Sequence, residues 1–141
     1  MNLRTYLAQA SPEEWHQVAW TWNGENGQDE LRWIVRRPTC DRGTALLVYG
    51  GGAPRYFAQY ATRDEVPEHE LDGYNLVLDI ERRYLAGAYT RQEIAFDPRG
   101  EYGGARQGTT LTARHTALPN RRPIPAAMYV ATPERQLARA A

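Results

Sequence analysis

Few side chains in this sequence combine the type and the spacing that catalysis or metal binding requires. Cys40 is the only thiol among the 141 residues, and Asp41 directly after it opposes formation of a thiolate. His16, His69 and His115 lack the spacing of metal ligands, so we expect surface or partly packed histidines. The sequence therefore predicts no catalytic residue, no metal site and no cofactor.

Two carboxylates, Glu93 and Asp97, flank a short alternating segment and could form an acid and base pair. Nothing in the neighbouring sequence marks a cleft around them, which favours solvent-facing charges. A small hydrolase or transferase with an unrecognised carboxylate site is therefore the alternative function.

The most suggestive feature is an acidic stretch, because residues 64–81 contain seven carboxylates and no arginine. Five of them are candidate partner-binding residues: Asp64, Glu65, Glu68, Glu70 and Asp72. Such a surface would attract a basic protein and speed its association. Two structural alternatives remain open, namely pairing with the arginines of the last third of the chain, or a solvated helix face. Trp20 lies off the apolar face of its helix and is a candidate anchor, unless it belongs to a broad buried stripe.

Composition limits the class of partner. The formal net charge is zero, and all 17 basic residues are arginine, so no global field attracts nucleic acid or an anionic membrane. No apolar run has the length of a signal peptide core or a membrane span. We expect a cytoplasmic protein that binds neither nucleic acid nor membrane. The sequence does not indicate its oligomeric state.

The elements that must position these residues are mostly helices. The length suits one domain, residues 1–141, and the apolar spacing predicts a mainly α fold of the α+β type, a compact bundle of four or five helices. We expect the helices over about 11–22, 29–37, the apolar run between Pro38 and Gly50, and 68–85, with shorter turns at 2–10 and 53–60. The expected core comprises Trp15, Val18, Trp22, Leu31, Ile34, Val35, Ala45, Leu46, Val48, Tyr74, Leu78 and Leu85.

Local signals mark the helix ends. Ser11 and Glu14 form a capping-box pattern around Pro12, and Asp41 or Thr44 can cap the central helix. Beyond residue 90 the pattern alternates, which predicts a short β-hairpin from strands near 92–98 and 109–113. A helical turn is expected within 124–130.

The residues also resemble a known family. Trp33-Ile34-Val35 and the run Cys40-Asp41-x-Gly43-Thr44-Ala45-Leu46 resemble the signature of bacterial proteins that carry domain of unknown function 4274. The likeness covers about residues 14–98 and leaves a Gly- and Arg-rich extension, 99–141. Where the family usually has an aromatic residue after Tyr49, this chain has Gly50, so the central helix is expected to end early.

The resemblance brings no known activity. By analogy with small acidic-faced bacterial families, it implies an immunity protein. We therefore expect a non-enzymatic binding protein that neutralises a cognate antibacterial toxin with a basic surface by occluding it.

Overall fold

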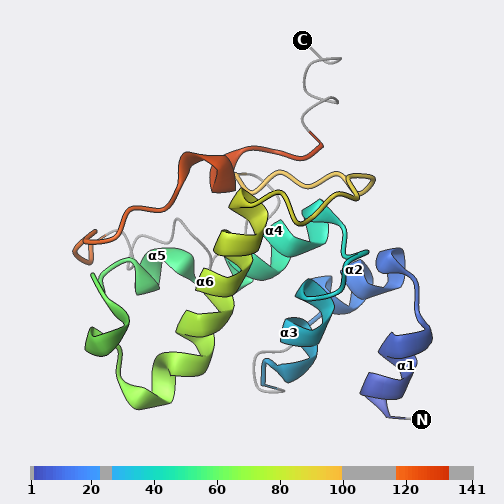
Figure 1. Ribbon diagram of the computed structural model, residues 1–141, viewed down its shortest axis with the longest axis horizontal. Coiled ribbons are helices and arrows are strands. Elements are labelled where there is room, and N and C mark those ends of the chain that lie inside the picture. Colours follow the sequence, from blue (N-terminus) through green and yellow to red (C-terminus); the bar gives the residue numbers. More distant parts are fainter. Residues whose placement is uncertain (1, 23–26, 100–116, 134–141) are drawn as a thin grey trace.

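The computed structural model describes residues 2–22, 27–99 and 117–133, and this part of the chain is mainly helical (Figure 1). The α-helices are α1 (Leu3–Gln9), α2 (Pro12–Trp20), α3 (Asp29–Val35), α4 (Arg42–Gly51), α5 (Pro54–Phe57) and α6 (Leu71–Leu85). The 3₁₀ helices are η2 (Arg63–Glu65), η3 (Glu68–Glu70) and η4 (Ala126–Tyr129). The described residues thus contain six α-helices, not the expected four or five, because the short turns expected at 2–10 and 53–60 both form helices.

α4 is the central helix. Every residue from Gly43 to Gly50 is buried, and the helix contacts α2, α3, α5 and α6. The prediction of a core helix after Pro38 is therefore confirmed. The helix also ends in the glycine run that was expected to close it, because α4 continues to Gly51 and uses Gly52 as its C-cap.

Truncation of one α4 side chain should test this packing. Leu46 is 1% exposed, so Leu46→Ala leaves a cavity and should lower the free energy of unfolding by about 2–5 kcal/mol, measured by equilibrium urea unfolding. Leu85→Ala is the control, since Leu85 is 54% exposed and its loss should cost under about 1 kcal/mol. Equal costs for the two variants would contradict the central position of α4.

The local cap predictions hold. Ser11 accepts a hydrogen bond from the Glu14 backbone, and Glu14 accepts one from the Ser11 backbone, which completes the capping box of α2. α4 is capped by Asp41, not Thr44. Helix α6 is followed by Gly87 at φ +76°, a left-handed conformation that glycine adopts without strain.

Most of the expected core is confirmed, with two corrections. Seven of the expected residues are buried: Trp15, Ile34, Val35, Ala45, Leu46, Val48 and Tyr74. Val18, Leu31 and Leu78 are half-buried and pack against them. Leu85 is exposed because it lines an open groove at the end of α6. Trp22 is half-buried because it lines a hollow.

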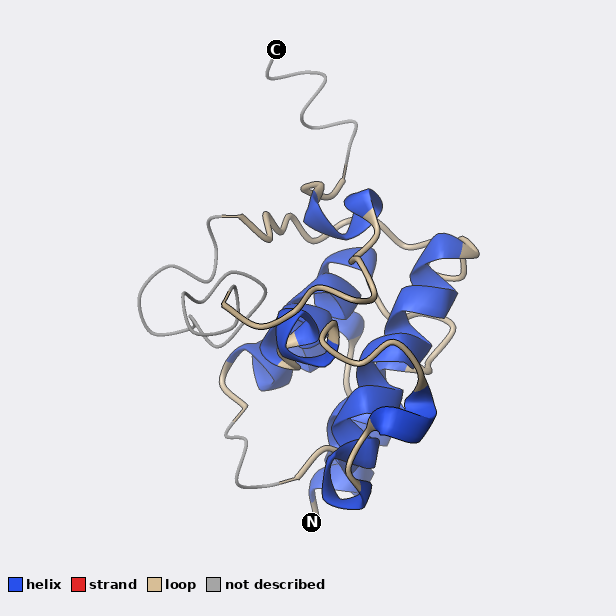
Figure 2. Cartoon of the chain, turned by 90° about the vertical axis from the view of Figure 1, so that its left-hand side faces the viewer, coloured by secondary structure: helices blue, strands red, loops and turns tan. Residues whose placement is uncertain are grey.

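The expected hairpin is not present in the described residues, and Figure 2 draws no strand there. Phe96 instead forms an isolated antiparallel bridge with Thr132, with two backbone hydrogen bonds of 2.9 Å. The alternating pattern of 92–98 thus marks an extended segment whose partner lies 36 residues further along the chain. The second expected strand, 109–113, and the expected frayed end, 135–141, lie outside the described residues.

Residues 117–133 cross one end of the helical layer, close to the C-terminus of α6 (Figure 1). The predicted helical turn within 124–130 is confirmed as η4, and Met128 on it is fully buried. Arg55 of α5 donates hydrogen bonds to the carbonyl oxygens of Leu118 and Pro119. No helix within the described ranges is long and apolar enough to cross a membrane.

Candidate functional site

Asp41 is a buried carboxylate at the start of α4, and its hydrogen bonds show what it does. One oxygen accepts from the backbone N–H of Gly43 at 2.8 Å. The other accepts from Arg91 at 2.7 Å and from the backbone N–H groups of Glu93 and Ile94 at 2.8 and 3.2 Å. Asp41 therefore caps α4 and fixes the extended segment 91–94 onto it, which is a structural role.

The neighbouring Cys40 fits the same role. Its side chain is fully buried, as predicted, and burial together with the Asp41 carboxylate raises the pKa of the Cys40 thiol, which the guanidinium of Arg91 only partly offsets. A thiol held protonated is a poor nucleophile.

Gly43 stands where no side chain fits. A Cβ atom at this position would lie 2.4 Å from the backbone oxygen of Ile94. Gly43→Ala should therefore destabilise the protein by about 1–3 kcal/mol, although alanine favours a helix more than glycine does. Gly51→Ala is the matched control in the same helix, because its Cβ meets no atom within 4 Å. Thermal unfolding of both variants decides the point, and a Gly43→Ala variant as stable as the control would refute the close approach.

The histidines behave as expected where they are described. His16 is half-buried, its Nδ1 lies 2.8 Å from the hydroxyl of Thr44, and burial lowers the pKa of His16 despite nearby Asp41. His69 is exposed beside Glu70. His115 lies outside the described residues. Within those residues, no group of three or more His, Cys, Asp or Glu side chains could hold a metal ion.

The structure assigns Glu93 and Asp97 to different arginines. Glu93 is exposed and pairs with Arg91 at 2.8 Å, whereas Asp97 pairs with Arg99 at 3.2 Å. Partial burial opposes ionisation of Asp97, but hydrogen bonds from the Arg99 backbone and guanidinium outweigh it and lower the pKa of Asp97. Asp97 therefore lacks the raised pKa of a general acid.

Two other carboxylates, which the sequence did not single out as a site, lie in a groove of about 550 Å³ along α6. Asp79 is bonded by Arg36, Arg82 and Arg83. Burial opposes its ionisation, but these arginines prevail and lower the pKa of Asp79.

Glu81 is the second carboxylate of this groove. It is buried, pairs with Arg122 and accepts a 2.8 Å hydrogen bond from Tyr49. In the sequence, the only indication of either residue is the contrast between the acidic stretch 64–81 and the arginine-rich last third of the chain.

The five predicted partner-binding carboxylates lie together in sequence and fall into two groups. Glu65 pairs with Arg121, and Glu70 accepts a hydrogen bond from Tyr60 at 3.1 Å. Asp64, Glu65, Glu68 and Asp72 are exposed, and the carboxylates of Asp64, Glu68 and Asp72 bond to no other described residue. The alternative in which the acidic stretch pairs with arginines of the last third is thus confirmed for Glu65 and Glu81.

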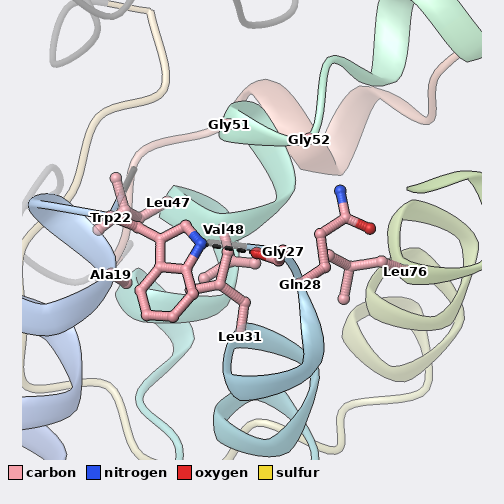
Figure 3. Close-up of a pocket in the computed structure, with 10 residues that line it drawn as sticks. All are labelled: Ala19, Trp22, Gly27, Gln28, Leu31, Leu47, Val48, Gly51, Gly52 and Leu76. Atoms are coloured by element: carbon pink, nitrogen blue, oxygen red, sulfur yellow. Dashed lines mark hydrogen bonds between the residues drawn. The ribbon is translucent and has the colours of Figure 1, made fainter. Parts of the chain in front are cut away.

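Trp20 is half-buried and packs against the core, which agrees with the buried stripe and not with an exposed anchor. Trp22 is also half-buried and lines a hollow of about 110 Å³ between α2, α3, α4 and α6 (Figure 3). Its indole N–H donates to the carbonyl of Gly27 at 2.8 Å, and Gln28 lies on the opposite side. The other lining residues are Ala19, Leu31, Leu47, Val48, Gly51, Gly52 and Leu76. None of the described residues that line this hollow has a titratable side chain.

A family model described as a domain of unknown function, DUF4274, matches residues 10–85, more than half of the chain. The match ends with α6, earlier than the expected limit of 98. No curated protein and no solved structure matches.

Proposed function

Because the chain belongs to the DUF4274 family, whose description names no activity, we propose from its surface chemistry that it is a non-enzymatic binding protein. Specifically, we propose an immunity protein that neutralises a cognate antibacterial toxin by occluding a basic surface. The observation that carries this proposal is the acidic surface, defined as Asp64, Glu65, Glu68, Glu70 and Asp72.

The acidic surface lies on η2, η3 and the first turn of α6, at the opposite end of the molecule from α1 (Figure 1). Two of its carboxylates hold the backbone in place, since Glu65 caps the turn at Thr62 and Glu70 is bonded by Tyr60. Asp64, Glu68 and Asp72 therefore stand on a backbone that these contacts hold in place. Binding to a surface whose backbone is already fixed costs less conformational entropy than binding that must first order a loop.

Aromatic residues next to this surface are better anchor candidates than Trp20. Tyr56 and Tyr60 are half-buried, and their rings meet edge to face with centroids 6.2 Å apart. Tyrosines in such positions combine apolar contact area with a polar tip, which suits the centre of a protein interface. A partner with arginines around an apolar contact would complement this arrangement.

Charge reversal tests the proposal. The triple variant Asp64→Arg, Glu68→Arg and Asp72→Arg leaves intact Glu65 and Glu70, whose carboxylates are hydrogen-bonded within the chain. Its association with the purified cognate toxin, sought as the product of the gene next to its own, should be slower by about tenfold or more at low salt, because electrostatic steering is lost. The salt dependence of the association rate should also shrink. Surface plasmon resonance at several salt concentrations measures both effects.

The control carries Asp29→Arg and Glu30→Arg, which reverse two carboxylates on α3, and it should bind like the wild type. Unchanged kinetics in the triple variant would remove the acidic surface from the mechanism. Occlusion also predicts that toxin activity falls to zero at one molar equivalent and that the toxin mass is unchanged. Inhibition by far less than one equivalent would instead indicate that the protein is an enzyme acting on the toxin.

A further inference from the structure

We propose that the hollow between α1 and α3, where four arginines converge around Trp33, binds closely spaced phosphate groups. The hollow measures about 270 Å³, and its lining consists of Arg4, Asp29, Arg32, Trp33, Arg36 and Arg37. Arg4 comes from α1 and the others from α3 or the turn after it, so only folding brings them together. The site meets the acidic surface at one point, where Arg32 donates to the backbone oxygen of Asp72, but it has its own lining residues, and the inference goes beyond the proposed function.

Trp33 holds two of the guanidinium groups. The Arg37 guanidinium lies 4.5 Å from the centroid of the Trp33 ring, and that of Arg4 lies 5.7 Å from it. The ring is itself fixed by an edge contact with buried Trp15 at 5.6 Å. Arginine stacked on an aromatic ring keeps its N–H edge available for hydrogen bonds, so this contact orients both groups.

The other two arginines are oriented by hydrogen bonds. Arg32 donates to the backbone oxygen of Asp72 at 3.1 Å and to the Asp29 carboxylate at 3.4 Å. Arg36 donates to Asp79 at 3.2 Å. A guanidinium has five N–H donors, so each keeps several that bond to no other described residue. The hollow therefore presents preoriented donors that cost little entropy to engage.

Positive charge prevails in this hollow. Asp29 is the one carboxylate among its lining residues, and its side chain is 83% exposed, so water screens it strongly. Asp79, which pairs with Arg36, also pairs with Arg82 and Arg83. Four guanidinium groups against one screened carboxylate leave a local excess of positive charge, even though the whole chain has none.

Phosphate is the anion that this arrangement fits best. Each phosphate group can take two parallel N–H bonds from one guanidinium, and adjacent phosphates repeat the charge at a spacing that several arginines can meet together. The phosphates could come from the backbone of a nucleic acid or from a free oligophosphate. Base stacking is not expected to contribute, because the Trp33 ring already contacts two guanidinium groups.

The experiment uses the full chain and three probes: a twelve-residue oligothymidylate, tripolyphosphate and polyglutamate. Binding is followed by calorimetry between 20 and 200 mM salt. The variant Arg4→Gln with Arg37→Gln should bind phosphate probes at least tenfold more weakly, and for the oligonucleotide the slope of log K against log salt should fall by about two. The control, Arg63→Gln with Arg99→Gln, removes two exposed arginines elsewhere and should bind like the wild type.

Each outcome decides the proposal. Binding of both phosphate probes, or of one alone, supports the proposal. Which probes bind identifies the source of the phosphates as a nucleic acid backbone, a free oligophosphate or either. Equal or tighter binding of polyglutamate would overturn the assignment to phosphate. No binding at 20 mM salt, or an equal loss in the control, would overturn the site. Arg4→Gln alone, at an exposed position on α1, should weaken binding if the double variant fails to fold.

Discussion

Replacing Asp41 with alanine should lower the free energy of unfolding by about 3–5 kcal/mol, because it removes the buried partner of Arg91, which then keeps, among the described residues, only the exposed carboxylates of Glu13 and Glu93. The carboxylate is fully buried, and its loss also frees the backbone N–H groups of Gly43, Glu93 and Ile94. An unsatisfied buried donor adds to the cost. Equilibrium urea unfolding measures the change, with Asp41→Asn as the variant that preserves side-chain volume.

Glu93→Gln is the matched control for Asp41. Glu93 pairs with the same arginine, but its side chain is 65% exposed. Exposed ion pairs contribute at most about 1 kcal/mol, so this variant should be nearly neutral. If Asp41→Asn were equally neutral, the buried carboxylate would not hold segment 91–94 to α4.

Replacing Glu81 with alanine should have an effect of similar size, about 3–5 kcal/mol, for a different reason. Glu81 joins three parts of the chain: α6, Tyr49 on α4, and Arg122 in the C-terminal segment. Its removal leaves the Tyr49 hydroxyl without this acceptor in the core and Arg122 without its counter-ion. Urea unfolding should show this loss.

Glu65→Ala provides the comparison, because Glu65 pairs with the adjacent Arg121 at the surface and should cost at most about 1 kcal/mol. The double variant Glu81→Leu with Arg122→Leu should recover much of the loss, since an apolar pair no longer buries an unpaired charge. A double variant as unstable as Glu81→Ala would show that the Tyr49 hydrogen bond, not the ion pair, carries the effect.

The sequence predicted the features that depend on neighbouring residues. Ser11, Pro12 and Glu14 mark the start of α2 within four positions, and both hydrogen bonds of the capping box are present. Pro38 likewise separates α3 from α4. Helix starts and stops follow from such local chemistry, which explains why they were predictable.

Features that join distant residues were not predictable in the same way. The partners of Asp41 lie about 50 residues away, and Arg122 lies 41 residues from Glu81. Charge contrast suggested only that acids and arginines could meet. The alternation around Phe96 indicated an extended backbone but could not name Thr132 as its partner, because period two is the same for any pairing.

Side-chain environment at element ends was the other limit. Leu85 continues the apolar spacing of α6 and was expected inward, yet it lies where the helix passes beyond the core. Trp20 lies off the apolar face of its helix, and the sequence left open whether it is exposed or buried; it is half-buried because neighbouring elements cover it. Helical periodicity identifies a face, whereas the extent of coverage at each end depends on elements that the pattern does not describe.

The covering of the helical layer by residues 117–133 has a consequence for synthesis of the protein. Phe96 and Met128 complete the core from beyond residue 85, so a nascent chain that has just finished α6 still exposes the apolar surface that they will cover. At translation rates of about 5–20 residues per second, the interval until residue 133 is about 2–10 s. During this time the helices are open to chaperones and to other nascent chains. Stop codons placed after α6 should therefore yield aggregates, whereas those placed after residue 133 should not.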